Sequence, residues 1–217
     1  MSKEWSKAMR IMIAVPCMDQ VSAHFAHSLA SMNRVGETML AFEIGSLIYS
    51  SRNELAKKCI KANADAVLFL DSDMIFPEDT LEKMAKHIED GKEIVTGLYF
   101  RRRAPFTPVL YKELGIDANG EAFHENLEEL PDSKELFEVA GAGGGCLMIT
   151  KNVLLDVMLN YQTWFDPLAG IGEDLAFDIR ARDLDHKIWC DPTISCGHIG
   201  QLIINEEIWR TNFSGKE

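Results

Sequence analysis

Short apolar runs alternate with amphipathic segments along the first hundred residues of the chain. The runs are too short for buried helices and predict strands covered on both faces. They lie at 11–17, 39–44, 66–71 and 93–100. The segments between them place apolar residues at helical spacing and predict helices, which lie at 21–33, 46–63 and 77–91. This alternation is typical of a parallel α/β sheet with right-handed crossovers.

Two prolines indicate where elements end or begin. Pro16 marks the exit of the first strand into a loop. Pro77 opens the third helix, with Glu78 and Asp79 facing the positive end of the helix dipole.

The second half of the chain has a different pattern. Residues 101–138 begin with three arginines and continue through two prolines into an acidic stretch, which predicts an edge hairpin or a mobile loop. The later patterns predict alternating strands and helices. These are a strand at 146–149, a helix at 151–161 capped by Thr150, a helix from Glu173 and a strand at 187–194 broken by Pro192. No repeat or linker divides the chain.

Composition narrows the classes of function. The chain has 217 residues, with 22 Lys and Arg against 34 Asp and Glu, a net charge of −12. This charge argues against nucleic-acid binding, which depends on neutralising phosphates. The polar N-terminus and the short first apolar run predict no signal peptide and no membrane span. Five scattered cysteines without a C-x-x-C pair predict free thiols and a cytoplasmic protein.

Two carboxylates follow the apolar run at 66–71. In an extended chain Asp71 and Asp73 point to the same side, at the strand end where open α/β sheets bind ligands. Adjacent anions favour a divalent cation between them, and Mn²⁺ or Mg²⁺ suits oxygen ligands. The alternative is a helix cap beside a solvated acid, because Pro77 opens a helix just downstream.

Three other groups are candidates for the same site. His198, between glycines after the last strand, either is an ordinary strand-end histidine or adds a nitrogen ligand to the metal. Glu173 and Asp174 either cap a helix through its dipole or include a general base. Arg101–Arg103 either bind an anionic ligand or form a solvated basic turn.

The segment Gly141–Gly145 is nearly without side chains, which permits close backbone approach. Because a predicted strand follows at once, we expect it to lie beneath a ligand and not to be a linker. Neither G-x-G-x-x-G after the first strand nor a P-loop is present, so a dinucleotide enzyme or a P-loop NTPase is disfavoured.

Six segments resemble, in the same order, motifs of GT-A glycosyltransferases of the family-2-like type. They are Ile13–Cys17, Ser51–Ala56, Ala64–Asp73 with its D-x-D pair, Gly144–Ile149, Gly172–Phe177 with Arg180, and Gly197–His198. A D-x-D pair alone is a weak signal, whereas six ordered segments make the assignment fairly specific.

The resemblance implies an α/β fold, a single GT-A (Rossmann-like) domain over 1–217 with a central, mostly parallel mixed sheet flanked by helices. Residues of about 10–100 would form the nucleotide-binding half and about 101–200 the acceptor-side half. Residues 201–217 would form a C-terminal helix or tail.

The resemblance also implies roles for individual residues in a hexosyltransferase-type enzyme. Asp71, Asp73 and His198 would bind Mn²⁺ or Mg²⁺, which bridges the diphosphate of a UDP or GDP sugar. Asp174, beside Glu173, would deprotonate the acceptor hydroxyl if the enzyme inverts. The residues around the donor would be Pro16, Cys17, Arg52, Asn53, Asp71, Ser72, Arg102, Gly144 and Gly145.

No Q-x-x-R-W motif follows Glu173–Asp174, so we expect transfer of one sugar and not polymer synthesis. Inversion and retention both stay open, since the fold does not determine the outcome. One alternative is a haloacid-dehalogenase-type phosphatase, disfavoured because a strand–helix–strand–helix run precedes Asp71. Another is a non-catalytic nucleotide-sugar-binding module.

Overall fold

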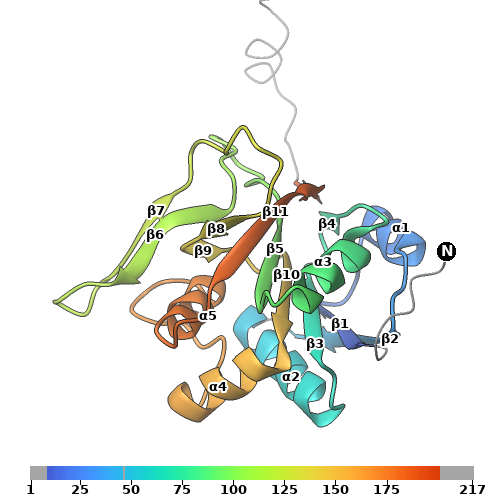
Figure 1. Cartoon of the computed structure of the whole chain (residues 1–217), viewed down its shortest axis with the longest axis horizontal. Coiled ribbons are helices and arrows are strands. Elements are labelled where there is room, and N and C mark those ends of the chain that lie inside the picture. The colour runs from blue at the N-terminus through green and yellow to red at the C-terminus, as the bar shows by residue number, and fades with distance from the viewer. Residues whose placement is uncertain (1–8, 46, 201–217) are drawn as a thin grey trace, which may run out of the picture.

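The computed structural model describes residues 9–45 and 47–200 (Figure 1), so the tail expected at 201–217 lies outside the described residues. At its centre is a seven-stranded sheet in the order β2-β1-β3-β10-β5-β11-β8. Its strands are β1 (Arg10–Cys17), β2 (Glu37–Ile44), β3 (Ala66–Leu70), β5 (Ile94–Leu98), β8 (Phe137–Val139), β10 (Cys146–Thr150) and β11 (Ile188–Ser195).

Helices and two smaller sheets surround this sheet. The helices are α1 (Ala23–Ser31), α2 (Ile48–Lys61), α3 (Thr80–Glu89), α4 (Lys151–Tyr161) and α5 (Glu173–Arg182). One small sheet pairs β4 (Met74–Ile75) with β12 (Gly197–His198). The other joins β6 (Leu110–Ile116) to β7 (Ala122–Asn126) and β9 (Gly141–Ala142).

The central sheet is mixed. β1 runs parallel to β2 and β3, and β5 runs parallel to β11. β10 lies antiparallel between β3 and β5, and β8 lies antiparallel beside β11. This insertion brings the glycines before β10 to the carboxyl end of β3, where the N–H of Asp71 donates to the carbonyl of Gly145 (3.0 Å).

The hydrophobic core covers both faces of the sheet. Side chains of α2, α4 and α5, including Leu55, Val153 and Phe177, pack on one face. Side chains of α1 and α3, including Phe25 and Leu81, pack on the other. Every residue of β3 is buried, as its apolar sequence predicts. The core therefore fixes β3 from both sides and presents its carboxyl end as a rigid edge.

Most predicted elements are present, and some boundaries move. The helix predicted at 151–161 is α4, and Thr150 caps it by accepting from the N–H of Val153. α3 begins at Thr80 and not at Pro77, because the Thr80 hydroxyl donates to the Pro77 carbonyl (2.7 Å) in the preceding turn.

The strand predicted at 11–17 is β1, which ends at Cys17, one residue beyond the proline that was expected to mark its exit. Pro16 lies inside the strand, opposite Glu43 of β2. Pairing of β1 with β3 stops at Ala14, so beyond that point the strand has a neighbour on one side only. A proline is tolerated there because one edge of the strand needs no donor.

The hairpin expected within 101–138 is confirmed by β6 and β7, which project from the body of the protein (Figure 1). Before it, an isolated bridge joins Phe100 to Pro108, and the N–H of Arg101 donates to the carbonyl of Thr107 (2.9 Å). These contacts close a short loop that carries Arg101–Arg103 to the edge where β3 ends.

The expectation of free thiols is confirmed, since all five cysteines are buried and none forms a disulfide. Among residues 9–45 and 47–200, no helix combines the length and the apolarity needed to cross a bilayer.

Candidate active site

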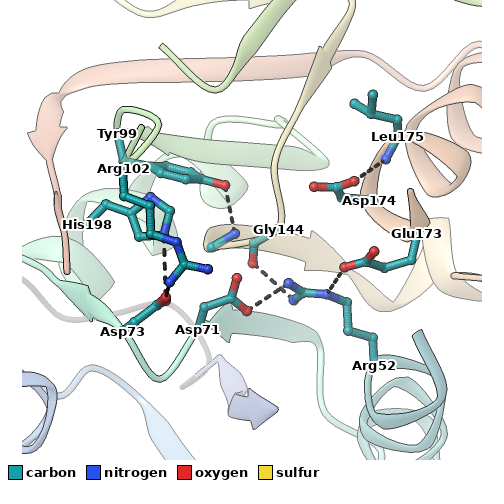
Figure 2. A network of polar contacts seen from close by, with 11 residues as sticks. Arg52, Asp71, Asp73, Tyr99, Arg102, Gly144, Glu173, Asp174, Leu175 and His198 are labelled. Carbon is teal, nitrogen blue, oxygen red and sulfur yellow. Dashed lines mark hydrogen bonds and ion pairs between the residues drawn. The ribbon is translucent and has the colours of Figure 1, made fainter. Parts of the chain in front are cut away.

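Arg52 is a buried cation on which distant segments of the chain meet (Figure 2). It lies in α2 and is 2% exposed. Its Nη2 donates to Oδ1 of Asp71 (2.7 Å) and its Nη1 to the carbonyl of Gly144 (3.1 Å). Its Nε donates to Oε1 of Glu173 (3.3 Å). One guanidinium thus joins the end of β3, the glycine segment and the start of α5.

The glycine segment provides space for two large side chains. A Cβ on Gly144 would lie 2.7 Å from the guanidinium carbon of Arg52. A Cβ on Gly143 would lie 2.0 Å from the Tyr99 hydroxyl, and the N–H of Gly145 donates to that hydroxyl (3.0 Å). We expected these glycines to make room for a ligand; those at 143 and 144 make room for Tyr99 and Arg52.

Burial and neighbouring charges shift the pKa values of these groups. Burial favours neutral Arg52, but Asp71, Glu173 and Asp174 outweigh it and raise its pKa above the ordinary value. Burial also raises the pKa of Asp71, although Arg52 opposes the shift. The pKa of Asp174 is raised by burial and then by the charge of Glu173. A carboxylate with a raised pKa is a stronger base once it is ionised.

Glu173 and Asp174 open α5 and contact different groups. Glu173 binds Arg52, whereas one oxygen of Asp174 accepts the N–H of Leu175 (2.9 Å). Both carboxylates line a cleft of about 520 Å³. The dipole of α5 favours these acids at its start, so the capping interpretation and the general-base interpretation are compatible.

A second polar cluster forms where β12 pairs with β4. This pairing places His198 opposite Met74, and Nε2 of His198 lies 3.5 Å from Oδ2 of Asp73. Arg102 forms an ion pair with the same oxygen (Figure 2). The hydrogen bond with Asp73 raises the pKa of His198. We call Asp73, Arg102 and His198 the cation corner.

The two carboxylates of the D-x-D pair have different partners. The expectation that both point to one side of an extended chain is wrong, because β3 ends at Leu70 and the chain then turns. In that turn the N–H of Met74 donates to the carbonyl of Asp71 (3.0 Å). Asp71 therefore pairs with Arg52, and Asp73 with the other members of the cation corner.

The cation corner fits a divalent ion that a substrate helps to bind. In the described part of the chain, no three His, Cys, Asp or Glu side chains form a complete metal cluster. Asp73 and His198 supply one oxygen and one nitrogen, and Mg²⁺ is often bound by one or two carboxylates plus substrate phosphates. Nδ1 of His198 lies 2.9 Å from the carbonyl of Phe100. Because a carbonyl only accepts, Nδ1 donates to it, and the lone pair of Nε2 would become available to an ion once that nitrogen has lost its own proton.

Two clefts meet at this corner. The cleft of about 520 Å³ is lined by Ile48, Arg52, Asp71, Asp73, Tyr99, Arg101–Ala104, Val109, Gly144, Glu173, Asp174 and His198. A cleft of about 640 Å³ is lined by Gln20–Ser22, Ser72, Asp73, Arg102, Arg103, Ile199 and Gly200. Asp73, Arg102 and Arg103 line both, so one elongated ligand can extend across the corner.

Four predicted donor-binding residues lie outside the lining of both clefts. Pro16 and Cys17 are buried in β1, and Gly145 is buried beneath Tyr99. The side chain of Asn53 donates to Asp166 (2.7 Å) and accepts the N–H of Phe165 (2.9 Å). Asn53 therefore holds the loop before α5.

Tyr99 is a site residue that the sequence analysis missed. Its hydroxyl lies against Gly145, and burial, followed by the charge of Asp71, raises its pKa well above the usual range. Its ring packs edge-on against His198, with 5.6 Å between ring centroids. The glycine-rich segment at 141–145 is the only sequence signal for a large neighbour here.

The mixed sheet, the layers of helices and the carboxylates at the end of β3 define the GT-A class of glycosyltransferase fold. A197 from STIV is similar, with a TM-score of 0.65 and 17% identity over 89% of this chain and 87% of that one. GalNAc-T7, crystallised with UDP, GalNAc and Mn²⁺, has a TM-score of 0.63 and 12% identity over 91% of this chain and 45% of that one. S. aureus TarS, in complex with UDP-GlcNAc, has a TM-score of 0.56 and 15% identity over 90% of this chain and 60% of that one.

The chain belongs to glycosyl transferase family 2, whose family model matches residues 46–157. No curated protein sequence matches it significantly. The predicted GT-A fold of the family-2-like type is thereby confirmed.

Proposed function

We propose that the protein transfers one sugar from a nucleotide-diphosphate sugar to an acceptor hydroxyl. The observation that carries this proposal is the Arg52 network, which holds Asp71 and Glu173 beside Asp174 in one cleft of about 520 Å³ that also reaches the cation corner. Family membership supports sugar transfer. The UDP and UDP-GlcNAc in two structural neighbours favour a UDP donor, with GDP as the alternative.

The donor diphosphate would lie at the corner that both clefts share. Asp73 and His198 would hold Mn²⁺ or Mg²⁺ there, with Asp71 close by, and the ion would supply positive charge to the leaving diphosphate. Arg102 ends at the same corner and would add a second positive charge as the leaving group becomes more negative. Asp71, held by Arg52, would accept hydrogen bonds from the ribose.

Asp174 would take the proton from the acceptor hydroxyl. It lines the cleft, and its raised pKa strengthens it as a base. Glu173 binds Arg52 from the adjacent position and would keep the start of α5 in place. This arrangement favours inversion of the sugar, which NMR of the product anomer measures directly.

The phosphatase alternative loses support from the family match and from the segment before α5. The segment before Glu173 is a loop, where the phosphatase family has a strand.

Sugar release from UDP- and GDP-sugars, measured with and without Mn²⁺, tests the proposal, with phosphomonoesters as alternative substrates. Asp174→Asn should keep the thermal shift caused by the donor but lower turnover by about 10²–10⁴-fold. Asp183→Asn, an exposed change at the other end of α5, is the matched control and should keep turnover. Hydrolysis of monoesters without sugar transfer would disprove the proposal, and full turnover in Asp174→Asn would remove that residue as base.

A further inference from the structure

The strand that carries His198 to the site contains a bulge. β11 pairs with β5 in parallel register up to Asp191, and pairing resumes at Ser195, opposite the next residue of β5. Residues 192–194 are therefore extra in β11. Without them, His198 would lie three positions further along the strand, which is about 10 Å at the usual rise. The bulge thus decides whether His198 reaches the cation corner.

Asp191 closes the bulge with its own side chain. Its Oδ1 accepts from the N–H (2.8 Å) and the hydroxyl (2.7 Å) of Thr193. Its Oδ2 lies 2.8 Å from Nε2 of His87, on α3. Burial by itself would raise the pKa of Asp191, but the bonds from His87 and Thr193 outweigh it and lower the pKa. The side chain is therefore a nearly buried anion with both oxygens bound.

Two neighbouring elements hold the bulge from outside. Lys83, one turn before His87 in α3, donates to the carbonyl of Thr193 (3.2 Å). In β5, Gly97 leaves the space that Ile194 fills, since a Cβ there would lie 3.0 Å from the Ile194 side chain and 3.1 Å from its carbonyl oxygen. A side chain from α3 and the space left in β5 therefore hold the bulge in one conformation.

Beyond the bulge, backbone contacts lead directly to the cation corner. The N–H of Cys196 donates to the carbonyl of Leu98 (2.8 Å). Gly197–His198 then pairs with β4, and the N–H of Ile199 donates to the carbonyl of Asp73 (2.8 Å). The register of the whole segment therefore follows from the point at which β11 leaves the bulge.

We infer that Asp191 is a positioning residue for the cation corner. By holding the bulge against His87, it sets the register at which His198 meets Asp73. Asp191 acts through the intervening backbone and not by contact with the donor. The inference rests on the proposed function, in which Asp73 and His198 bind a divalent cation.

Amide hydrogen exchange of the full-length protein without metal tests the register directly. Asp191→Ala removes the bonds to Thr193 and His87, so exchange at Ile199 should become at least about tenfold faster. Asp191→Asn keeps one acceptor for Thr193, so its exchange rate at Ile199 should lie between those of the wild type and Asp191→Ala. An unchanged rate at Ile199 in Asp191→Ala would overturn the inference.

Glu93→Gln is the matched control for exchange. Glu93 pairs with another histidine, His186 (2.9 Å), just before the start of β5 and at the opposite end of β11 from the bulge. This variant should leave exchange at Ile199 unchanged. An equal acceleration in Glu93→Gln would show general loosening of the sheet and would also overturn the inference.

Binding of Mn²⁺ alone, followed by the EPR signal of the free ion well below each unfolding temperature, tests the consequence for the cation corner. Asp191→Ala and His198→Ala should each weaken binding about 10–100-fold. The double variant should bind Mn²⁺ no more weakly than His198→Ala, because both changes remove the same interaction.

Wild-type affinity in Asp191→Ala would overturn the inference. Equal affinity in wild type and His198→Ala would instead disprove the proposed cation site, and the exchange rates would still decide the role of Asp191.

Discussion

Nη2 of Arg52 lies 2.7 Å from Oδ1 of Asp71, and the arginine side chain is 2% exposed. The pair joins α2 to the end of β3, and the same guanidinium reaches Glu173 on α5. Two acids of the proposed active site are thus bound directly by one buried residue.

Replacing Arg52 should reduce both stability and activity. Arg52→Ala leaves Asp71 and Glu173 without their shared cation, and removing one partner of a buried ion pair typically costs about 3–5 kcal/mol. Urea unfolding measures this loss. Lys57→Ala, which removes an exposed lysine from the same helix, should change the unfolding midpoint little. Equal loss in both variants would contradict a special role for Arg52.

Gly144→Ala should disrupt the same network from the backbone side. The added Cβ would lie 2.7 Å from the Arg52 guanidinium, so the arginine or the glycine segment must move, at a cost of about 1–3 kcal/mol. Gly197→Ala is the stability control, because its Cβ meets Ile75 at an ordinary 3.4 Å. A crystal structure of Gly144→Ala with Arg52 unmoved would refute this explanation.

Arg102 and a divalent cation should compete for Oδ2 of Asp73. Arg102→Gln removes the competing ion pair, so the affinity for Mn²⁺ alone should rise several-fold in EPR titrations. Affinity for the donor should fall, because one positive charge near the diphosphate is lost. Arg103→Gln removes the same charge from the neighbouring position and should raise Mn²⁺ affinity less. A decrease in Mn²⁺ affinity in Arg102→Gln would contradict the competition.

Asp178 should make stability depend on pH. It is fully buried in α5; one oxygen accepts the N–H of Ala142 (2.7 Å), and Oδ1 has no hydrogen-bond partner. Burial raises its pKa well above the usual value. The folded protein therefore retains a proton that the unfolded chain releases near pH 4, and the contribution of Asp178 to stability falls as pH rises above that value.

Asp178→Asn imitates the protonated acid at every pH. Its melting temperature should exceed that of the wild type at pH 7, and the difference should shrink as the pH approaches about 4. The exposed change Asp183→Asn should show no such trend. A difference that grows towards acid would have the wrong sign and would disprove the assignment.

Predictions from local sequence were accurate where one segment determines the outcome. The apolar run at 66–71 became the fully buried β3, and the pattern at 151–161 became α4 with its Thr150 cap. They were less exact where a neighbouring strand decides the outcome. Pro16 was expected to mark the exit of the first strand, yet β1 continues through it to Cys17, because β3 leaves that part of β1 unpaired on one side.

The candidate site shows the same division. The residue types at 71, 73, 173, 174 and 198 identified the acids and the histidine, and the structure places them around one cleft. The partners of each acid were not predictable. Whether Asp71 binds a metal or Arg52 depends on a helix packed across the sheet, and no pattern of spacing reports that contact. Tyr99 was missed because burial next to glycines is a property of the fold.

The sequence by itself determined the order of the longer strands and of the helices, the carboxylates at the end of β3 and the class of chemistry they favour, because hydrophobic period and residue type are local properties. Only the tertiary structure decided that β10 enters between β3 and β5 and that a bulge in β11 brings His198 to Asp73. Such pairings between remote segments follow from the packing of the whole sheet, since each one depends on the hydrogen bonds and volumes of its neighbours.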